Sequence, residues 1–141
     1  MRAVIGRGDF VLGDEVRALE DAFARYCGAA CAVGVDNGTS ALELILRALN
    51  IGPGDEVIVP SFGFSSDANC VIQRGAIPVF VDIRTEDLNI NWMCVSEAIS
   101  PKTKAVIPVH YAGVASGCGG YDSIKIIEAA AQCIGGLTMF G

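Results

Sequence analysis

The fold is decided by residues 55–81, which read DEVIVPSFGFSSDANCVIQRGAIPVFV. Residues 56–59 predict a strand, and Pro60 ends it because proline has no N–H to donate to a sheet. The serines at the start of residues 65–74 and the glycine that follows this segment predict a helix. Residues 78–81 predict a second apolar strand. A strand, a helix and a strand in this order favour a parallel pair joined by a right-handed crossover.

The same alternation extends on both sides of this unit. Before it, the residue pattern predicts a helix over 14–26, a strand over 31–35 and a helix over 41–49. After it, we predict a helix over 93–99 and a strand over 105–109. The strands are apolar throughout rather than alternating, which is typical of a parallel sheet covered on both faces. We therefore predict an α/β fold, with a mostly parallel sheet and flanking helices.

The last part of the chain is harder to interpret. Residues 121–133 fit either a strand followed by a turn or a single helix, and both remain open. The glycine-rich residues 117–120 break any periodic pattern. A length of 141 residues favours one domain over 1–141. We expect the helix near 14–27 to pack beside the sheet.

Composition narrows the classes of partner. Hydrophobic residues make up 52% of the chain, charged residues 18%, and the net charge is −6. Nucleic acids and anionic membranes attract basic surfaces, so this charge argues against both. No apolar run reaches the roughly 18 residues of a membrane span, and no signal peptide is visible. We therefore expect a cytoplasmic protein that binds neither nucleic acid nor membrane.

The cysteines do not indicate a metal site. The six cysteines form no CxxC pair, and the chain has one histidine. Structural zinc sites need closely spaced cysteines and histidines. We predict no metal ligand, and free, mostly buried thiols.

Ligands of open parallel sheets bind beyond the carboxyl ends of the strands. Four segments follow predicted strands and are therefore candidates for a site: 36–40, 61–66, 82–84 and 110–113. In the third segment, we interpret Asp82 as a cap or turn residue rather than as an acid–base group.

Residues 36–40 (DNGTS) link a predicted strand to a predicted helix. A helix N-terminus has unpaired N–H groups and a dipole that favours an anion. Gly38 lets the backbone approach a ligand closely, while Thr39 and Ser40 add hydroxyl donors. A phosphate fits this turn, and so does an ordinary capped helix. The turn is neither a Rossmann GxGxxG nor a P-loop, which argues against dinucleotides and nucleoside triphosphates.

Four ordered motifs then carry a resemblance: VGVDNGTSAL at 33–42, IGPGDEVIVPSF at 51–62, GAIPVFVDI at 75–83 and TKAVIPVHYAG at 103–113. They are similar to the sugar-nucleotide aminotransferases of the DegT/DnrJ/StrS type, with a match over about 8–115. The resemblance implies part of the large domain of a fold-type I enzyme that uses pyridoxal 5'-phosphate (PLP). It also implies a dimer, and amino transfer, usually from glutamate, to a keto sugar carried on a nucleotide.

The resemblance assigns roles to individual residues. It implies that Thr39 and Ser40 hold the cofactor phosphate, that Phe64 stacks on the pyridine ring and that Gln132 approaches the ring oxygen. An aromatic side chain gains from contact with a flat cofactor, although Phe64 fits core packing equally well. His110 fits a hydrogen-bonded structural residue as well as a cofactor contact.

The chain departs from the family pattern in the altered region 116–141. Family members have an aspartate in the segment that here reads IEAAAQ, and Ala129 replaces it. That aspartate keeps the pyridine nitrogen protonated, so that the ring can accept electrons. The stretch before Ile127 is shorter than the family's and lacks room for a whole helix. None of the three lysines, Lys102, Lys104 and Lys125, matches the lysine that attaches the cofactor. We therefore predict no catalytic residue.

Three hypotheses follow for the function. The first, which we favour for ancestry, is a truncated aminotransferase that is inactive alone. The second is half of a split aminotransferase that another chain completes. The third is a non-catalytic binding or assembly module. Ala129 argues against the second, because a split enzyme should keep its aspartate.

Overall fold

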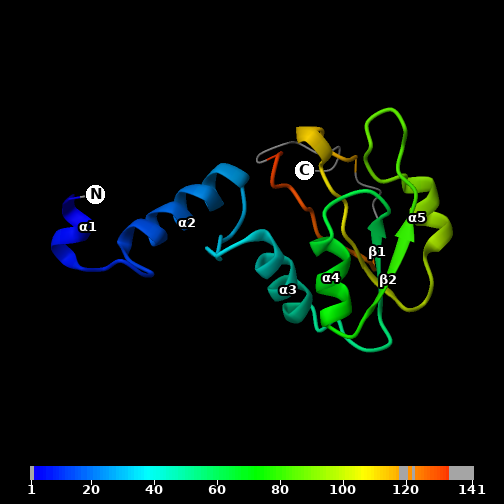
Figure 1. Ribbon diagram of the computed structural model, residues 1–141, viewed down its shortest axis with the longest axis horizontal. Coiled ribbons are helices and arrows are strands. Elements are labelled where there is room, and N and C mark those ends of the chain that lie inside the picture. The colour runs from blue at the N-terminus through cyan, green and yellow to red at the C-terminus, as the bar shows by residue number, and fades with distance from the viewer. Residues whose placement is uncertain (1, 118–120, 122, 134–141) are drawn as a thin grey trace. The chain divides into compact units, whose positions relative to one another are not determined.

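The computed structural model describes residues 2–117, 121 and 123–133. The chain divides into two compact units, residues 1–36 and residues 37–141. Figure 1 shows the helices of the first unit and the sheet of the second.

The first unit contains two helices, α1 (Arg2–Arg7) and α2 (Asp14–Cys27). Two acidic residues lie in the first turn of α2, where the helix dipole favours negative charge. Gly28 ends the helix in the left-handed conformation, with φ 66°, and its N–H bonds to carbonyls of the last turn. The helix predicted over 14–26 is thus confirmed, whereas α1 was not predicted.

The strand predicted over residues 31–35 is wrong, because no strand is assigned there. A strand needs a neighbour to bond with, and none of the described strands pairs with this segment. Instead, the Gly34 N–H donates to Glu20 Oε1 of α2 at 2.7 Å. The apolar pattern indicated a strand but held no information about its partner.

The second unit is built on a parallel sheet with the strand order β2-β1-β3-β4. The strands are β1 (Glu56–Pro60), β2 (Ile77–Val81), β3 (Thr103–Val106) and β4 (Lys125–Ile126). The strands predicted near 56–60, 78–82 and 105–109 are confirmed, although β3 begins and ends earlier than predicted. Pro60 is the last residue of β1, as expected for a residue without an N–H.

The helices of the second unit lie where the sequence pattern placed them. They are α3 (Gly38–Ala48), α4 (Ser66–Gln73) and α5 (Trp92–Ala98), followed by a short 3-10 helix, η1 (Tyr111–Gly113). Helix α3 begins before the predicted position 41 because Asn37 caps it. The Asn37 Oδ1 accepts a hydrogen bond from the Ser40 N–H at 2.9 Å, which satisfies a donor of the first turn.

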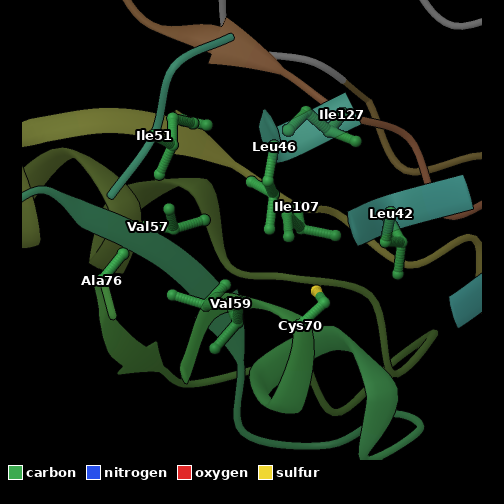
Figure 2. Packing of buried hydrophobic residues seen from close by; sticks show 11 residues of the cluster. Leu42, Leu46, Ile51, Val57, Val59, Cys70, Ala76, Ile107 and Ile127 are labelled. Carbon is green, nitrogen blue, oxygen red and sulfur yellow. The ribbon is translucent and has the colours of Figure 1, made fainter. Parts of the chain in front are cut away.

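Different helices cover the two faces of the sheet (Figure 1). Successive residues of a strand point to opposite faces. Val57 and Val59 of β1 belong to the buried cluster that includes Leu46 of α3 and Cys70 of α4, as Figure 2 shows. Ile58 belongs to a second cluster, which includes a valine of α5. The prediction of a parallel α/β sheet flanked by helices is confirmed.

Strand β2 is the outer strand next to β1. The Ile77 N–H donates to Asp55 O at 2.9 Å, and Val81 O accepts from the Ser61 N–H at 2.8 Å, so both groups point towards β1. Pro78 alternates with them and therefore faces the side of β2 where no described strand pairs.

Residues 121–133 follow the strand alternative rather than the helix. Strand β4 pairs with β3, and a parallel bridge joins Val109 to Ala129 further along. Between β3 and β4, the described residues form only η1. Tyr121 and Trp92 pack against the cluster on the α5 face, with their ring centroids 6.2 Å apart. The altered region thus contributes an aromatic ring to the covering of this face.

Within the described residues, no helix is long and apolar enough to cross a membrane. In the same part of the chain, no cluster of three or more histidine, cysteine, aspartate or glutamate residues could hold a metal ion. The described cysteines are free, but the prediction that they are mostly buried is wrong. Cys70 is buried, whereas Cys27 and Cys31 are exposed because the first unit buries little apolar surface.

Replacing Leu46 by alanine should destabilise the second unit. Leu46 is fully buried, whereas Leu44 on the same helix is 50% exposed. Leu46→Ala leaves a cavity and should cost about 2–5 kcal/mol, while the matched Leu44→Ala should cost about 0.5 kcal/mol or less. Urea denaturation followed by circular dichroism measures both changes. Equal losses would contradict this assignment of the buried face of α3.

Candidate cofactor site

A cavity of about 670 Å³ opens beyond the carboxyl ends of the strands in the second unit. Small-molecule sites typically have volumes of about 300–1,000 Å³. The residues that line this cavity come from four segments, 37–45, 63–67, 109–111 and 128–132. The loops that follow β1 and β3 therefore meet the start of α3 and the end of the described chain at one edge of the sheet.

The start of α3 forms one wall of the cavity. Gly38 and Thr39 line it, and a Cβ added to Gly38 would meet nothing within 4 Å. Ser40 does not line the cavity, and its N–H is bonded to the cap residue Asn37. Of the two hydroxyls predicted to hold a phosphate, the structure therefore places that of Thr39 at the cavity. The dipole of α3 favours an anion at this end.

Phe64 lies on the cavity wall between β1 and α4. Its side chain is 74% exposed, so core packing, which the sequence left open, does not explain it. An exposed aromatic ring beside a cavity is available for stacking on a flat ligand. The structure thus favours ligand contact for Phe64.

Gln132 and Ala129 line the cavity from the chain that continues β4. Gln132 Oε1 accepts a hydrogen bond from the Ala112 N–H at 3.0 Å, so the amide N–H groups are the ones that can donate to a ligand. The Ala129 N–H donates to Pro108 O at 2.9 Å, which fixes residue 129 beside the end of β3. The methyl group of Ala129 brings no charge to this position.

His110 and Asp82 do not line the cavity. His110 is 3% exposed, and its Nδ1 accepts a hydrogen bond from the Ser116 N–H at 3.0 Å. Its Nε2 lies 3.6 Å from Glu128 Oε1. These contacts favour the structural interpretation of His110. Asp82 is exposed and directly follows β2, and its interpretation as a cap or turn residue stays a prediction.

Asp67, in the first turn of α4, was missed by the sequence analysis. It lines the cavity and is only 6% exposed. Burial raises the pKa of its carboxyl group. The sequence contains a signal for this position, because the spacing from Asp67 to Cys70 and Val71 places all three on the buried face of α4.

Asn89 and Tyr111 were also missed. Asn89 is 1% exposed. Its Oδ1 accepts a hydrogen bond from the Tyr111 N–H at 3.1 Å, and its Nδ2 donates to Val114 O at 3.2 Å. The Tyr111 ring packs against Phe62 with centroids 5.2 Å apart and lines the cavity. Asn89 is thus a positioning residue for the loop after β3, and nothing in its local sequence marks it.

The charged groups around the cavity are negative. Asp67 and Glu128 line it, and no lysine or arginine is among its described lining residues. Lys102 precedes β3, Lys104 is the second residue of β3 and Lys125 begins β4. All three lysines therefore lie towards the amino ends of their strands, opposite the cavity. No described lining residue offers an amine for attaching a cofactor.

Comparison with known proteins shows which family the chain belongs to. The model of the DegT/DnrJ/EryC1/StrS aminotransferase family matches residues 1–137, a wider range than the 8–115 that the sequence motifs cover. A UDP-N-acetyl-3-dehydro-alpha-D-glucosamine 3-aminotransferase from Acidithiobacillus ferrooxidans is 44% identical over 138 residues. The matched region covers 94% of this chain and 37% of that protein.

Solved structures are also similar to this chain. DesV of S. venezuelae has a TM-score of 0.85 and 38% identity, covering 95% of this chain and 38% of DesV. NtdA from Bacillus subtilis, solved with bound cofactor PMP, has a TM-score of 0.84 and 32% identity, covering 95% of this chain and 32% of NtdA. The chain spans less than two-fifths of the length of each of these three relatives.

Asp67→Asn should stabilise the second unit at neutral pH. Burial raises the pKa of this carboxyl group above its ordinary value of 3.8, so the folded chain binds the proton more tightly than the unfolded chain. The contribution of Asp67 to stability therefore falls as pH rises above 3.8, and the ionised group carries a penalty at pH 7. Asparagine has the same shape without that charge.

Urea denaturation at pH 7 and at a pH close to 4 measures this difference, which should shrink at the lower pH. Asp82→Asn is the matched control, because Asp82 is exposed. It should change the free energy of unfolding by about 0.5 kcal/mol or less at either pH. A loss of stability from Asp67→Asn at pH 7 would show that the carboxylate is compensated within the fold.

Proposed function

Because the chain belongs to the DegT/DnrJ/EryC1/StrS aminotransferase family, we propose that residues 1–141 are part of the large domain of a PLP-dependent aminotransferase. The substrate that we propose is a keto sugar carried on a nucleotide, with glutamate as amino donor. The matched relative from Acidithiobacillus ferrooxidans is named for a UDP-sugar substrate, which supports this class of substrate. The dimer and the cytoplasmic location that the sequence analysis expected stay predictions.

The observation that carries the proposal is the cavity itself. It gathers Thr39, Phe64 and Gln132, which are far apart in the chain, at the carboxyl ends of the strands. These groups fit the two parts of the cofactor. The start of α3 receives the phosphate, with Thr39 at the cavity, while Phe64 and Gln132 receive the ring and its oxygen. The part that the sequence analysis gave to Ser40 stays a prediction, because Ser40 does not line the cavity. When bound, PLP supplies an electron sink for amino transfer.

We further propose that the 141-residue chain does not catalyse amino transfer on its own. The described cavity offers no amine to attach the cofactor or to move a proton at the substrate carbon. Residue 129 is an alanine and lacks the charge that the family places beside the pyridine nitrogen. A second candidate function is a binding module. It is favoured because the cavity has a helix end suited to phosphate but no lysine among its described lining residues. The split enzyme of the sequence analysis, completed by a separate chain carrying the lysine, stays an alternative hypothesis, against which Ala129 argues.

Binding of PLP should be reversible and weak, with a dissociation constant above about 1 μM. Thr39→Asp should weaken it by about fivefold or more, because a unit charge about 4 Å from the phosphate costs roughly 1–4 kcal/mol. The helix itself should tolerate the change, since an acidic residue suits the first turn. Titration calorimetry measures the affinity, and Thr85→Asp, in an exposed turn away from the cavity, is the control. Equal affinities of the two variants would place the phosphate elsewhere.

The chain should show no transaminase activity above that of free PLP. General acid–base groups typically contribute a factor of about 100 to 10,000 each, so a site without the lysine should fall to the cofactor background. Ala129→Asp should not restore activity, because the amine is still missing. The assay is glutamate-dependent amination of nucleotide-linked 3- or 4-keto sugars with added PLP. A reproducible rate above PLP alone, lost in Thr39→Asp, would overturn the proposed inactivity.

A further inference from the structure

Resting on this proposed function, we infer that Asp67 supplies, from α4, the carboxylate that faces the pyridine nitrogen of the cofactor. In the family pattern, an aspartate at position 129 has this role, and Ala129 cannot fill it. In this chain the carboxylate would thus come from the first turn of α4 rather than from the segment after β4, within the same cavity.

The first support is the position of the carboxylate relative to residue 129. A Cβ added to Gly63 would lie 3.2 Å from Asp67 Oδ2 and 3.4 Å from Val109 Cγ2. One point in space therefore adjoins both side chains. Asp67 and Ala129 both line the cavity, and Val109, near Asp67, is the bridge partner of Ala129. The absence of a side chain at Gly63 leaves open space beside the Asp67 carboxylate.

The second support is that Asp67 has no cation to balance it within the described part of the site. Its carboxylate accepts a long hydrogen bond from the neighbouring Ser66 Oγ at 3.5 Å and also interacts with the backbone of Phe64, and both partners are uncharged. A buried carboxylate without a cation is costly, and aspartate is seldom buried without a partner. A protonated pyridine nitrogen would give Asp67 both a counter-charge and an N–H donor.

The third support comes from comparing the two acidic residues at the cavity. The Glu128 side chain is 41% exposed, and its Oε1 lies 3.6 Å from His110 Nε2. Glu128 thus has both solvent and a histidine as partners. Asp67 is buried within the cavity wall and lacks such a partner among the described residues. Of the two acidic residues, Asp67 is therefore the one that lacks a counter-charge in the described part of the site, which a protonated ring would supply.

The proton balance of this pairing is simple. Burial favours the protonated form of the Asp67 carboxyl in the empty cavity. On binding, the proton passes from the carboxyl to the ring nitrogen, or the ring arrives already protonated beside an ionised carboxylate. Either route leaves one proton on the nitrogen and a carboxylate that accepts its hydrogen bond.

The test measures binding of pyridoxamine 5'-phosphate, whose amine does not react with lysines. Titration calorimetry on the 141-residue chain compares wild type, Asp67→Asn, Ala129→Asp and the double variant Asp67→Asn/Ala129→Asp. Asp67→Asn should weaken binding at least tenfold, the scale of one charge-assisted hydrogen bond. The double variant should recover most of that loss, because it returns the carboxylate to position 129. Asp82→Asn is the matched control and should bind like wild type.

Two further readouts separate this role from a structural one. The nitrogen-15 chemical shift of ring-labelled pyridoxamine phosphate should report a protonated ring nitrogen in wild type and a neutral one in Asp67→Asn. Inorganic phosphate should bind Asp67→Asn at least as well as wild type, because the phosphate end of the site keeps its groups. Loss of phosphate binding together with the cofactor would assign Asp67 to the fold and overturn the inference.

The outcomes also distinguish this inference from the proposed function. If wild type does not bind pyridoxamine phosphate, the proposed cofactor site is wrong, and the role of Asp67 falls with it. If wild type binds it and Asp67→Asn binds equally well, the site stands and the inference about Asp67 is overturned. A double variant that binds no better than Asp67→Asn, while circular dichroism shows it folded, would also overturn the exchange between positions 67 and 129.

Discussion

The packing of β1 between β2 and β3, all running in one direction, is the constraint on which the second unit depends. Val57, Ile58 and Val59 of β1 are buried on both faces of the sheet, which requires helices on both sides. A parallel pair can be joined only by a crossover that returns the chain to the same starting edge. The carboxyl ends of the strands consequently meet at one edge, together with the starts of α3 and α4. Phe64, which follows β1, reaches the cavity for this reason, and Thr39 joins it from the start of α3.

The sequence predicted those parts of the fold that local signals encode. Pro60 ended β1 and Gly75 followed α4 at the expected positions, because the missing N–H of proline and the left-handed φ of glycine act within a few residues. The strand prediction for residues 31–35 was wrong because a strand forms only when a second segment pairs with it, and the sequence pattern described only one segment. For the same reason, the sequence could not decide between a strand and a helix in residues 121–133, and the pairing of β4 with β3 decided it.

The candidate site was predictable to a similar extent. The rule on strand ends located the cavity, and the resemblance identified Thr39, Phe64 and Gln132, which line it. Asp67 was missed because it lies inside a helix whose apolar residues suggested plain packing. Its burial is a tertiary property that depends on β1 and on the end of β3. A buried carboxylate whose pKa is raised by its surroundings is the kind of local conflict that functional sites show.

Pro78 gives a further property to the side of β2 where no described strand pairs. Along this strand, the backbone groups of Ile77 and Val81 bond towards β1, so by alternation Pro78 and Phe80 present theirs outward. A strand arriving from another molecule would look for N–H donors there, and Pro78 has none. The exposed side chains of Ile77 and Phe80 would otherwise make this edge a template for aggregation. Pro78 therefore removes one of the donors that edge-to-edge pairing along β2 would need.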